Sequence, residues 1–163
     1  MPRQLLHGLF NRPRESHKYD YGRVFIIGGS QSMAGAPVLA GRAALRSGAG
    51  VVELCVPTGI AAIAAGFDPC LITHGLPSDA SDGFSAGNLE PMCALAARAD
   101  VIVCGPGFGR SPEINQLVKT LWQNMPQPMV VDAGALFALA QLTLEEVKQH
   151  AGARILTPHA GEM

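Results

Sequence analysis

The sequence predicts an α/β fold, with a mostly parallel central sheet and helices on both of its faces. Short apolar runs alternate with segments of helical periodicity, and most of the runs end at glycine or at a polar residue. The chain is also 48% hydrophobic and only 15% charged, which suits strands that are buried on both faces. Its 163 residues are enough for one domain with a hydrophobic core.

The first unit of this fold lies between residues 17 and 57. Val24 and the three apolar residues after it form a run that stops at two glycines, as a buried strand does. Pro37 suits the first turn of the next helix, because its fixed φ is already helical. Arg42 and Arg46 lie four residues apart and indicate the exposed face of that helix. A second strand at residues 51–56 makes the unit a right-handed βαβ crossover between parallel strands.

The later elements continue this alternation. The helix that begins at Ser111 has the clearest signals: an N-cap serine, Pro112 at its first position and the acidic Glu113 in its first turn. Thr143 and Glu146 form a capping box that starts another short helix. We expect strands at residues 70–74, 100–104, 129–131 and 154–156, helices at residues 58–67 (with Thr58 as a cap), 88–99, 111–125 and 134–142, and a surface loop at residues 76–86.

Charge and cysteine content exclude several classes of protein. The net charge is -1, so nothing indicates binding to nucleic acid or to a membrane surface. No apolar run approaches the roughly 20 residues of a membrane span, and residues 1–16 have no signal-peptide pattern. Cys55, Cys70, Cys93 and Cys104 form no C-x-x-C pair, which favours reduced thiols over a zinc site or disulfides. We expect a cytoplasmic protein, without a metal site of its own, that forms a homo-oligomer.

Four predicted strands end in small or polar residues. These ends are the pair Gly28 and Gly29, the turn from Gly105 to Gly109, the single residue Asp132, and residues 157–159. The carboxyl ends of parallel strands share one edge of a sheet, and ligands bind in the crevice outside that edge. The sequence therefore predicts one site to which all four ends contribute.

The turn from Gly105 to Gly109 leads directly into a helix. Its backbone N–H groups, beside the positive end of the helix dipole, suit a phosphate or a diphosphate. The structural alternative is a tight turn that needs positive φ, and the three other strand ends favour binding. A dinucleotide-binding fingerprint is not indicated, because the spacing of Gly28, Gly29 and Gly35 is not G-x-G-x-x-G.

Asp132 and His159 are the candidate side chains at this edge. A carboxylate at the end of a strand can hold a ribose hydroxyl, a Mg²⁺-bound water or a loop N–H, and a purely structural cap is equally compatible. His159 follows a Thr-Pro turn, and a lone histidine is usually structural.

Several segments of the chain, in this order, resemble the ADP/ATP-dependent NAD(P)H-hydrate dehydratase family of the ribokinase-like superfamily. The resemblance implies a three-layer ribokinase-like fold. It also implies dehydration of hydrated NADH or NADPH with ATP or ADP and Mg²⁺, in which the ring hydroxyl is phosphorylated and phosphate is then eliminated. The matching segments are SHKYDYGRV, IGGS, GAPVLAGRAALRSGAG, DVIVCGPGFGR, VVDAGAL and ILTPHAGEM.

The same resemblance implies which residues contact the substrate. Ala160 stands where the family usually has proline, which can loosen the turn after His159. With Asp132 added from the strand-end argument, the predicted substrate-binding residues are Gly35, Ala36, Pro37, Gly105, Gly107, Gly109, Asp132 and His159.

In the resembled family, the catalytic Asp belongs to a G-x-G-D segment. That segment lies well downstream of the one that corresponds to ILTPHAGEM and His159 in this chain. No G-x-G-D occurs in this sequence. We therefore expect an irregular lead-in at residues 1–16 and an incomplete dehydratase domain at residues 17–163. Its C-terminal part, with the catalytic Asp, is expected beyond the chain end, and residues 1–163 alone should be inactive and expose apolar surface.

Two alternatives share the fold. A ribokinase-like small-molecule kinase would leave a stable phosphorylated product, whereas the dehydratase would release phosphate. A non-catalytic nucleotide-binding remnant would bind its ligand without turnover.

Overall fold

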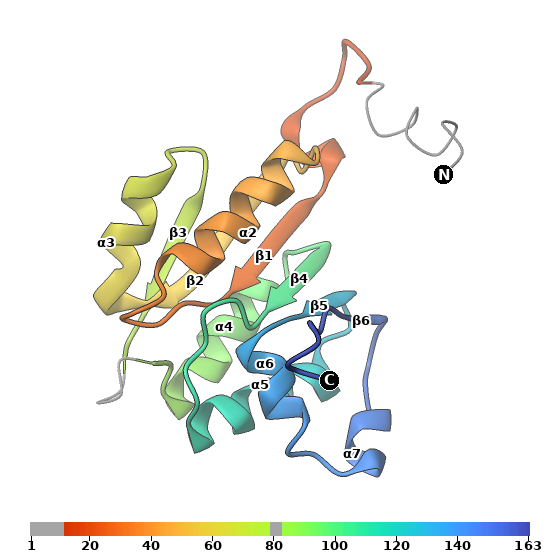
Figure 1. Ribbon diagram of the computed structural model, residues 1–163. Coiled ribbons are helices and arrows are strands. Elements are labelled where there is room, and N and C mark those ends of the chain that lie inside the picture. The colour runs from red at the N-terminus through yellow and green to blue at the C-terminus, as the bar shows by residue number, and fades with distance from the viewer. Residues whose placement is uncertain (1–11, 79–82) are drawn as a thin grey trace.

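The computed structural model describes residues 12–78 and 83–163. A six-stranded sheet runs through it, and all neighbouring strands are parallel (Figure 1). The spatial order is β3-β2-β1-β4-β5-β6, so the predicted parallel sheet is confirmed. The strands are β1 (Arg23–Ile27), β2 (Val51–Pro57), β3 (Ile72–Leu76), β4 (Val101–Cys104), β5 (Met129–Val131) and β6 (Arg154–Leu156).

Helices cover both faces of this sheet (Figure 1). α2 (Gly35–Arg46) and α3 (Thr58–Phe67) enclose an apolar cluster with Ile26, whereas α4 (Leu89–Ala96), α5 (Pro112–Asn124) and α6 (Gly134–Leu139) enclose one with Phe25 and Ile27. Neighbouring residues of β1 thus serve opposite cores, as the pleat of a strand requires. The three-layer arrangement is confirmed. Three short elements, η1 (Lys18–Tyr21), η2 (Ala86–Asn88) and α7 (Leu144–Lys148), complete the described structure.

The strand order reverses at β1, which pairs with β2 on one side and with β4 on the other. The α2 crossover lies on one face of the sheet and the α5 crossover on the other. Such a reversal opens a crevice outside the carboxyl ends of the two central strands. Gly28 and Gly29 follow β1, and Gly105 follows β4, so these glycines flank the crevice.

The α5 helix forms as its sequence predicts. The Ser111 hydroxyl oxygen accepts a hydrogen bond from the Ile114 N–H at 3.2 Å, with Pro112 in the first turn. The apolar stripe from Ile114 to Trp122 is buried. Trp122 also donates its Nε1–H to the Val147 carbonyl at 2.9 Å, which fixes the segment of α7 against α5. The stripe therefore serves packing.

Several predicted boundaries differ from the structure. β3 begins at Ile72, not at residue 70, because the Asp68 carboxylate accepts the Cys70 N–H at 2.9 Å and closes a turn before the strand. Thr58 does not cap α3, since Pro57 occupies the N-cap position and the helix has no side-chain cap. Residues 1–11 of the predicted lead-in and residues 79–82 of the predicted loop lie outside the described residues.

Two helices are shorter than predicted. α4 starts after Asn88, whose side-chain oxygen accepts the Ser85 N–H at 2.6 Å and holds the preceding turn. α6 ends at Leu139 rather than at residue 142, because the N–H groups of Gln141 and Leu142 donate to carbonyls only three residues back. Such tight turns are common where α-helices end.

The β6 strand forms one edge of the sheet and leaves apolar side chains uncovered. Ile155 is 60% exposed and Leu156 is 48% exposed. Adjacent residues of a strand point to opposite faces, so β6 exposes apolar surface on both. This is the exposure expected from the sequence. None of the helices within residues 12–78 and 83–163 is long and apolar enough to cross a membrane.

Candidate functional site

A cavity of about 460 Å³ lies at the carboxyl edge of the sheet. The loop after β1, the turn after β4, the start of α6 and the segment after β6 all contribute to it. Segments that follow these four strand ends thus reach one cavity, but of the predicted residues only those of the turn from Gly105 to Gly109 line it. That a ligand binds there stays a prediction. The residues that line the cavity are Met33, Gly107, Phe108, Gly109, Arg110, Ala133, Gly134, Leu136, Phe137, Ala140, Gly161 and Glu162.

Packing fixes two glycines of the turn after β4. Gly105 has φ +116° and Gly107 has φ +77°, values that side chains rarely tolerate. A Cβ on Gly105 would lie 1.9 Å from the Asp132 carbonyl oxygen, and one on Gly107 would lie 2.8 Å from the Met33 carbonyl oxygen. The turn itself thus requires glycine at both positions, as the structural alternative predicts. A further role for them in substrate binding stays a prediction.

Backbone hydrogen bonds join this turn to the loop after β1. The Gly29 N–H donates to the Pro106 carbonyl at 2.8 Å, and the Gly105 N–H donates to the Ile27 carbonyl at 3.0 Å. A Cβ on Gly28 would lie 2.3 Å from the Pro106 carbonyl oxygen. The two glycine loops can approach this closely only without side chains, and together they support one side of the cavity.

Gly35 and Gly109 differ from these packed glycines, because nothing lies within 4 Å of a Cβ built on either. Gly109 lines the cavity, whereas Gly35 begins α2 outside the lining. Ala36 and Pro37 pack beside the glycine loops; the Cβ of Ala36 lies 3.0 Å from a Cβ built on Gly107. Two predicted glycines, Gly107 and Gly109, line the cavity, and at Gly109 nothing packs against the Cβ position, so a ligand can approach its backbone.

Asp132 links the ends of β5 and β6. Its Oδ1 accepts a hydrogen bond from the Thr157 hydroxyl at 2.8 Å, which supports the structural role weighed for this residue. A role in binding stays a prediction. Ala133, which follows, has φ +49° and lines the cavity. A non-glycine residue with positive φ stores backbone strain of the kind that concentrates at functional sites.

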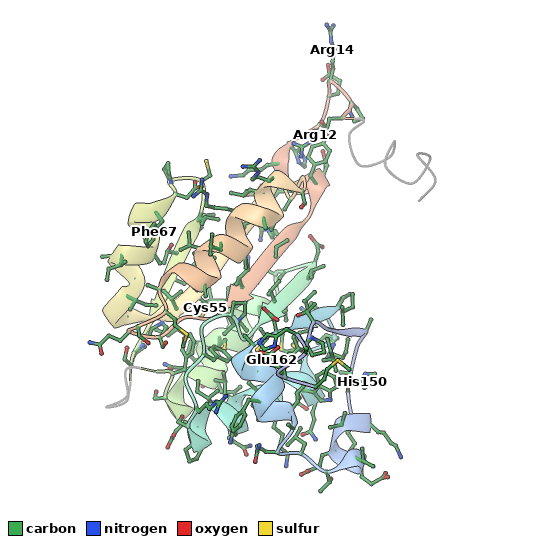
Figure 2. The ribbon with its side chains drawn as sticks, in the orientation of Figure 1. Arg12, Arg14, Cys55, Phe67, His150 and Glu162 are labelled. Atoms are coloured by element: carbon green, nitrogen blue, oxygen red, sulfur yellow. The ribbon has the colours of Figure 1, made fainter. Side chains whose placement is uncertain are left out.

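His159 lies beside the cavity and is not part of its lining. Its Nδ1 accepts the Gly161 N–H at 3.0 Å, so the neutral ring carries its proton on Nε2. The same nitrogen, Nε2, lies 3.5 Å from the Glu162 carboxylate, which also accepts the His159 backbone N–H at 3.1 Å. Glu162 lines the cavity together with Leu136 and Phe137 of α6, and it is labelled in Figure 2. Sequence reasoning missed Glu162, although its position three residues after His159 was a usable signal.

Arg110 and Phe137 were also missed. The Arg110 guanidinium carbon lies 4.1 Å from the centre of the Phe137 ring, a cation–π contact across the cavity wall. Arg110 directly follows Gly109, so its place at the end of the turn could have been read from the sequence. Phe137 gave no comparable signal, because its direction depends on where α6 begins.

The buried cysteines take no part in this site. Burial raises the pKa of Cys55 and of Cys104 to about 12, so both thiols stay protonated and unreactive at neutral pH. Both residues lie beside Ile27 in the register of the sheet. All four cysteines are free thiols; Cys55 and Cys104 are buried and Cys93 is partly buried, whereas Cys70 is exposed.

The family model for NAD(P)H-hydrate dehydratase matches residues 24–163, which include every segment that lines the cavity. The chain belongs to this family. A bifunctional NAD(P)H-hydrate repair enzyme of Moorella thermoacetica is 42% identical over 152 residues, which are 93% of this chain and 28% of that relative. The ADP-dependent (S)-NAD(P)H-hydrate dehydratase of Lactiplantibacillus plantarum is 34% identical over 82% of this chain and 45% of the relative. The chain thus spans less than half the length of these relatives.

Solved structures show the same fold. The ADP/ATP-dependent NAD(P)H-hydrate dehydratase of Bacillus subtilis, co-crystallised with ATP and Mg²⁺, has a TM-score of 0.69 at 30% identity. The match covers 93% of this chain and 49% of the Bacillus subtilis chain. A ribokinase-like superfamily protein of Enterococcus faecalis has a TM-score of 0.77 over 99% of this chain and 54% of its own. The ribokinase-like α/β fold expected from the sequence is confirmed.

Within residues 12–78 and 83–163, no three His, Cys, Asp or Glu side chains gather at one place. Two acids at the carboxyl edge of the sheet already have partners, because Glu162 accepts the His159 backbone N–H and Asp132 accepts the Thr157 hydroxyl. Proteins commonly hold Mg²⁺ through one or two carboxylates together with nucleotide phosphates, so these contacts assign no residue to the ion.

Proposed function

We propose that the protein containing this chain restores NADH and NADPH from their hydrated forms by an ADP- or ATP-dependent dehydration. One observation carries the proposal: the match to the NAD(P)H-hydrate dehydratase family runs through every segment that lines the cavity. The names of the relatives from Moorella thermoacetica and Lactiplantibacillus plantarum support the same activity.

In this proposal, the cavity takes the hydrated nicotinamide end of the substrate. Met33, Phe108 and Phe137 provide apolar surface for the ring, and a volume of about 460 Å³ is in the usual range of small-molecule sites. Gly109 lets the ligand approach the backbone, because it places no side chain in the way. The Nε2–H of His159 lies 3.5 Å from the Glu162 carboxylate, and a polar group on the ring would share this donor with Glu162.

The reaction needs help to lose the ring hydroxyl, because hydroxide is a poor leaving group. A phosphorylated hydroxyl leaves as phosphate, and the lone pair of the ring nitrogen assists its departure. A bound ATP or ADP would supply the phosphoryl group, with Mg²⁺ to neutralise charge. No step of that transfer is assigned to the described residues.

Incubation of the natural gene product with hydrated NADH, Mg²⁺ and either ATP or ADP tests the proposal. The dehydratase should restore the absorbance of the reduced nicotinamide and release one phosphate for each molecule restored. A stable phosphorylated product would instead identify a ribokinase-like kinase. Tight nucleotide binding without turnover would identify a non-catalytic remnant.

We further propose a cytoplasmic location and a homo-oligomeric state. The four free cysteines support a reducing compartment. Cell fractionation tests the location, and light scattering of the purified protein tests the oligomeric state.

A further inference from the structure

The Arg110 side chain is placed to hold an anion at the cavity. It leaves the chain between Gly109 and Ser111, at the point where the glycine turn enters α5. Its guanidinium stacks over the Phe137 ring at 4.1 Å. A cation–π contact orients the plane of the guanidinium and leaves its N–H donors free.

No carboxylate neutralises this arginine within the described residues. The ion pairs among them join other residues, and Arg110 donates no hydrogen bond there. The acid that lines the same cavity, Glu162, faces His159: it accepts the His159 backbone N–H at 3.1 Å and lies 3.5 Å from the imidazole. The cavity wall thus carries a cation whose charge is not already paired.

Arg110 is exposed and lines the same cavity as the apolar residues assigned to the nicotinamide ring. With the nicotinamide end of the substrate in that cavity, Arg110 is the cation available to the phosphate groups that follow it in the dinucleotide. An oriented guanidinium binds a phosphate through paired hydrogen bonds, which a lysine cannot reproduce.

We propose that Arg110 is a phosphate-binding residue for the dinucleotide substrate and that Phe137 orients its guanidinium. The inference rests on the proposed function and deepens it, because it assigns a residue to the phosphate part of that substrate. Two phosphates of the substrate share this chemistry: the central diphosphate, and the 2′-phosphate that only the NADPH form carries.

The test is calorimetric titration of the chain with three probes: NADH, NADPH and inorganic pyrophosphate. The first variant, Arg110→Gln, removes the positive charge and keeps a polar side chain. The second, Arg110→Lys, keeps the charge and removes the planar guanidinium with its paired N–H donors. Arg46→Gln is the matched control, because Arg46 is an exposed arginine that lines a different cavity, with Arg42 and Asp68. Circular dichroism confirms that each variant is folded.

Loss of charge-assisted hydrogen bonds should raise the Kd of Arg110→Gln roughly 10- to 100-fold, and Arg110→Lys should recover only part of it. Arg46→Gln should bind like the parent chain. Equal losses for NADH and NADPH assign Arg110 to the diphosphate, whereas a larger loss for NADPH assigns it to the 2′-phosphate. The affinity of the parent chain should also fall with added salt more steeply than that of Arg110→Gln.

Unchanged binding of all three probes by Arg110→Gln overturns the inference and leaves the proposed function standing. Arg110-dependent binding of pyrophosphate without binding of NADH or NADPH supports the anion site and contradicts the proposed substrate. If neither this chain nor the natural gene product that contains it binds any of the probes, both the inference and the proposed function are overturned.

Discussion

Replacement of Gly105 by alanine should destabilise the whole fold, because this glycine lies where three strands meet. Its N–H donates to the Ile27 carbonyl at 3.0 Å, and its φ is +116°. An added Cβ would lie 1.9 Å from the Asp132 carbonyl oxygen and 2.6 Å from the Ala135 Cβ. Neither neighbour is the flexible end of a long side chain, so the clash requires movement of the backbone.

The magnitude follows from two effects. Alanine at a strongly positive φ costs about 1–3 kcal/mol, and overpacking of a tight contact costs about 1–3 kcal/mol. The sum of about 2–6 kcal/mol is a large part of the 5–15 kcal/mol that typically stabilises a domain. In a chain of this size, each kcal/mol lowers the Tm by roughly 2–4 °C.

Thermal and urea unfolding, followed by circular dichroism, measure the effect. Gly109→Ala is the matched control in the same turn, since nothing lies within 4 Å of its Cβ, and its stability should stay within about 0.5 kcal/mol of the parent. Gly109→Ala should instead weaken ligand binding in the cavity, which Gly109 lines. A Tm of Gly105→Ala equal to that of Gly109→Ala would refute the packing argument.

Three further predictions concern packing, pH and thiol chemistry. Arg154→Met should lower the free energy of unfolding, measured in urea, by about 1.5–3 kcal/mol. The reason is that Arg154 donates hydrogen bonds of 2.6 to 2.9 Å to backbone carbonyls at and after the end of α5. An unchanged urea midpoint would contradict this. The pKa of Glu146 is lowered from 4.5 to about 2, chiefly by the hydrogen bond from Lys119. The pair therefore stabilises the fold above about pH 4.5, and this contribution is lost as the pH falls through 2. In an acid titration, the Glu146→Gln variant should lack the part of the stability loss that comes from protonation of Glu146. Superimposable acid transitions of the variant and the parent would count against this role of the pair. Alkylation at neutral pH, read by mass spectrometry, should modify the exposed Cys70 quickly and the buried Cys104 only after unfolding, whereas equal rates would show that Cys104 is accessible.

The strands and their common edge could be predicted because the apolar runs stop abruptly. Ile27, Cys104 and Val131 each precede a glycine or an acid, and the structure ends β1, β4 and β5 at those residues. The ends of helices and strands that are set by local hydrogen bonds were harder to predict. The start of β3 moved because Asp68 caps the turn before it, and that bond depends on a turn geometry that periodicity does not encode.

The sequence indicated the sheet edge at which the cavity lies, and only some of the residues that line it. The turn from Gly105 to Gly109 lies beside the cavity as expected, but the sequence could not show which of its glycines are packed and which is open. That distinction depends on neighbours distant in the chain, such as the Asp132 carbonyl. The contact that orients Arg110 could not be predicted from its place after the turn, because the Phe137 ring comes from another helix.

Nicotinamide nucleotides should bind in the cavity at the carboxyl edge of the sheet. A two-dimensional ¹H–¹⁵N NMR titration of the chain with hydrated NADPH tests it most directly. The account predicts that amide shifts concentrate at the cavity, in residues 107–110, 133–137 and 161–162. Shifts that concentrate instead at the cavity formed by Arg42 and Asp68, or no shifts at a saturating ligand concentration, would contradict it.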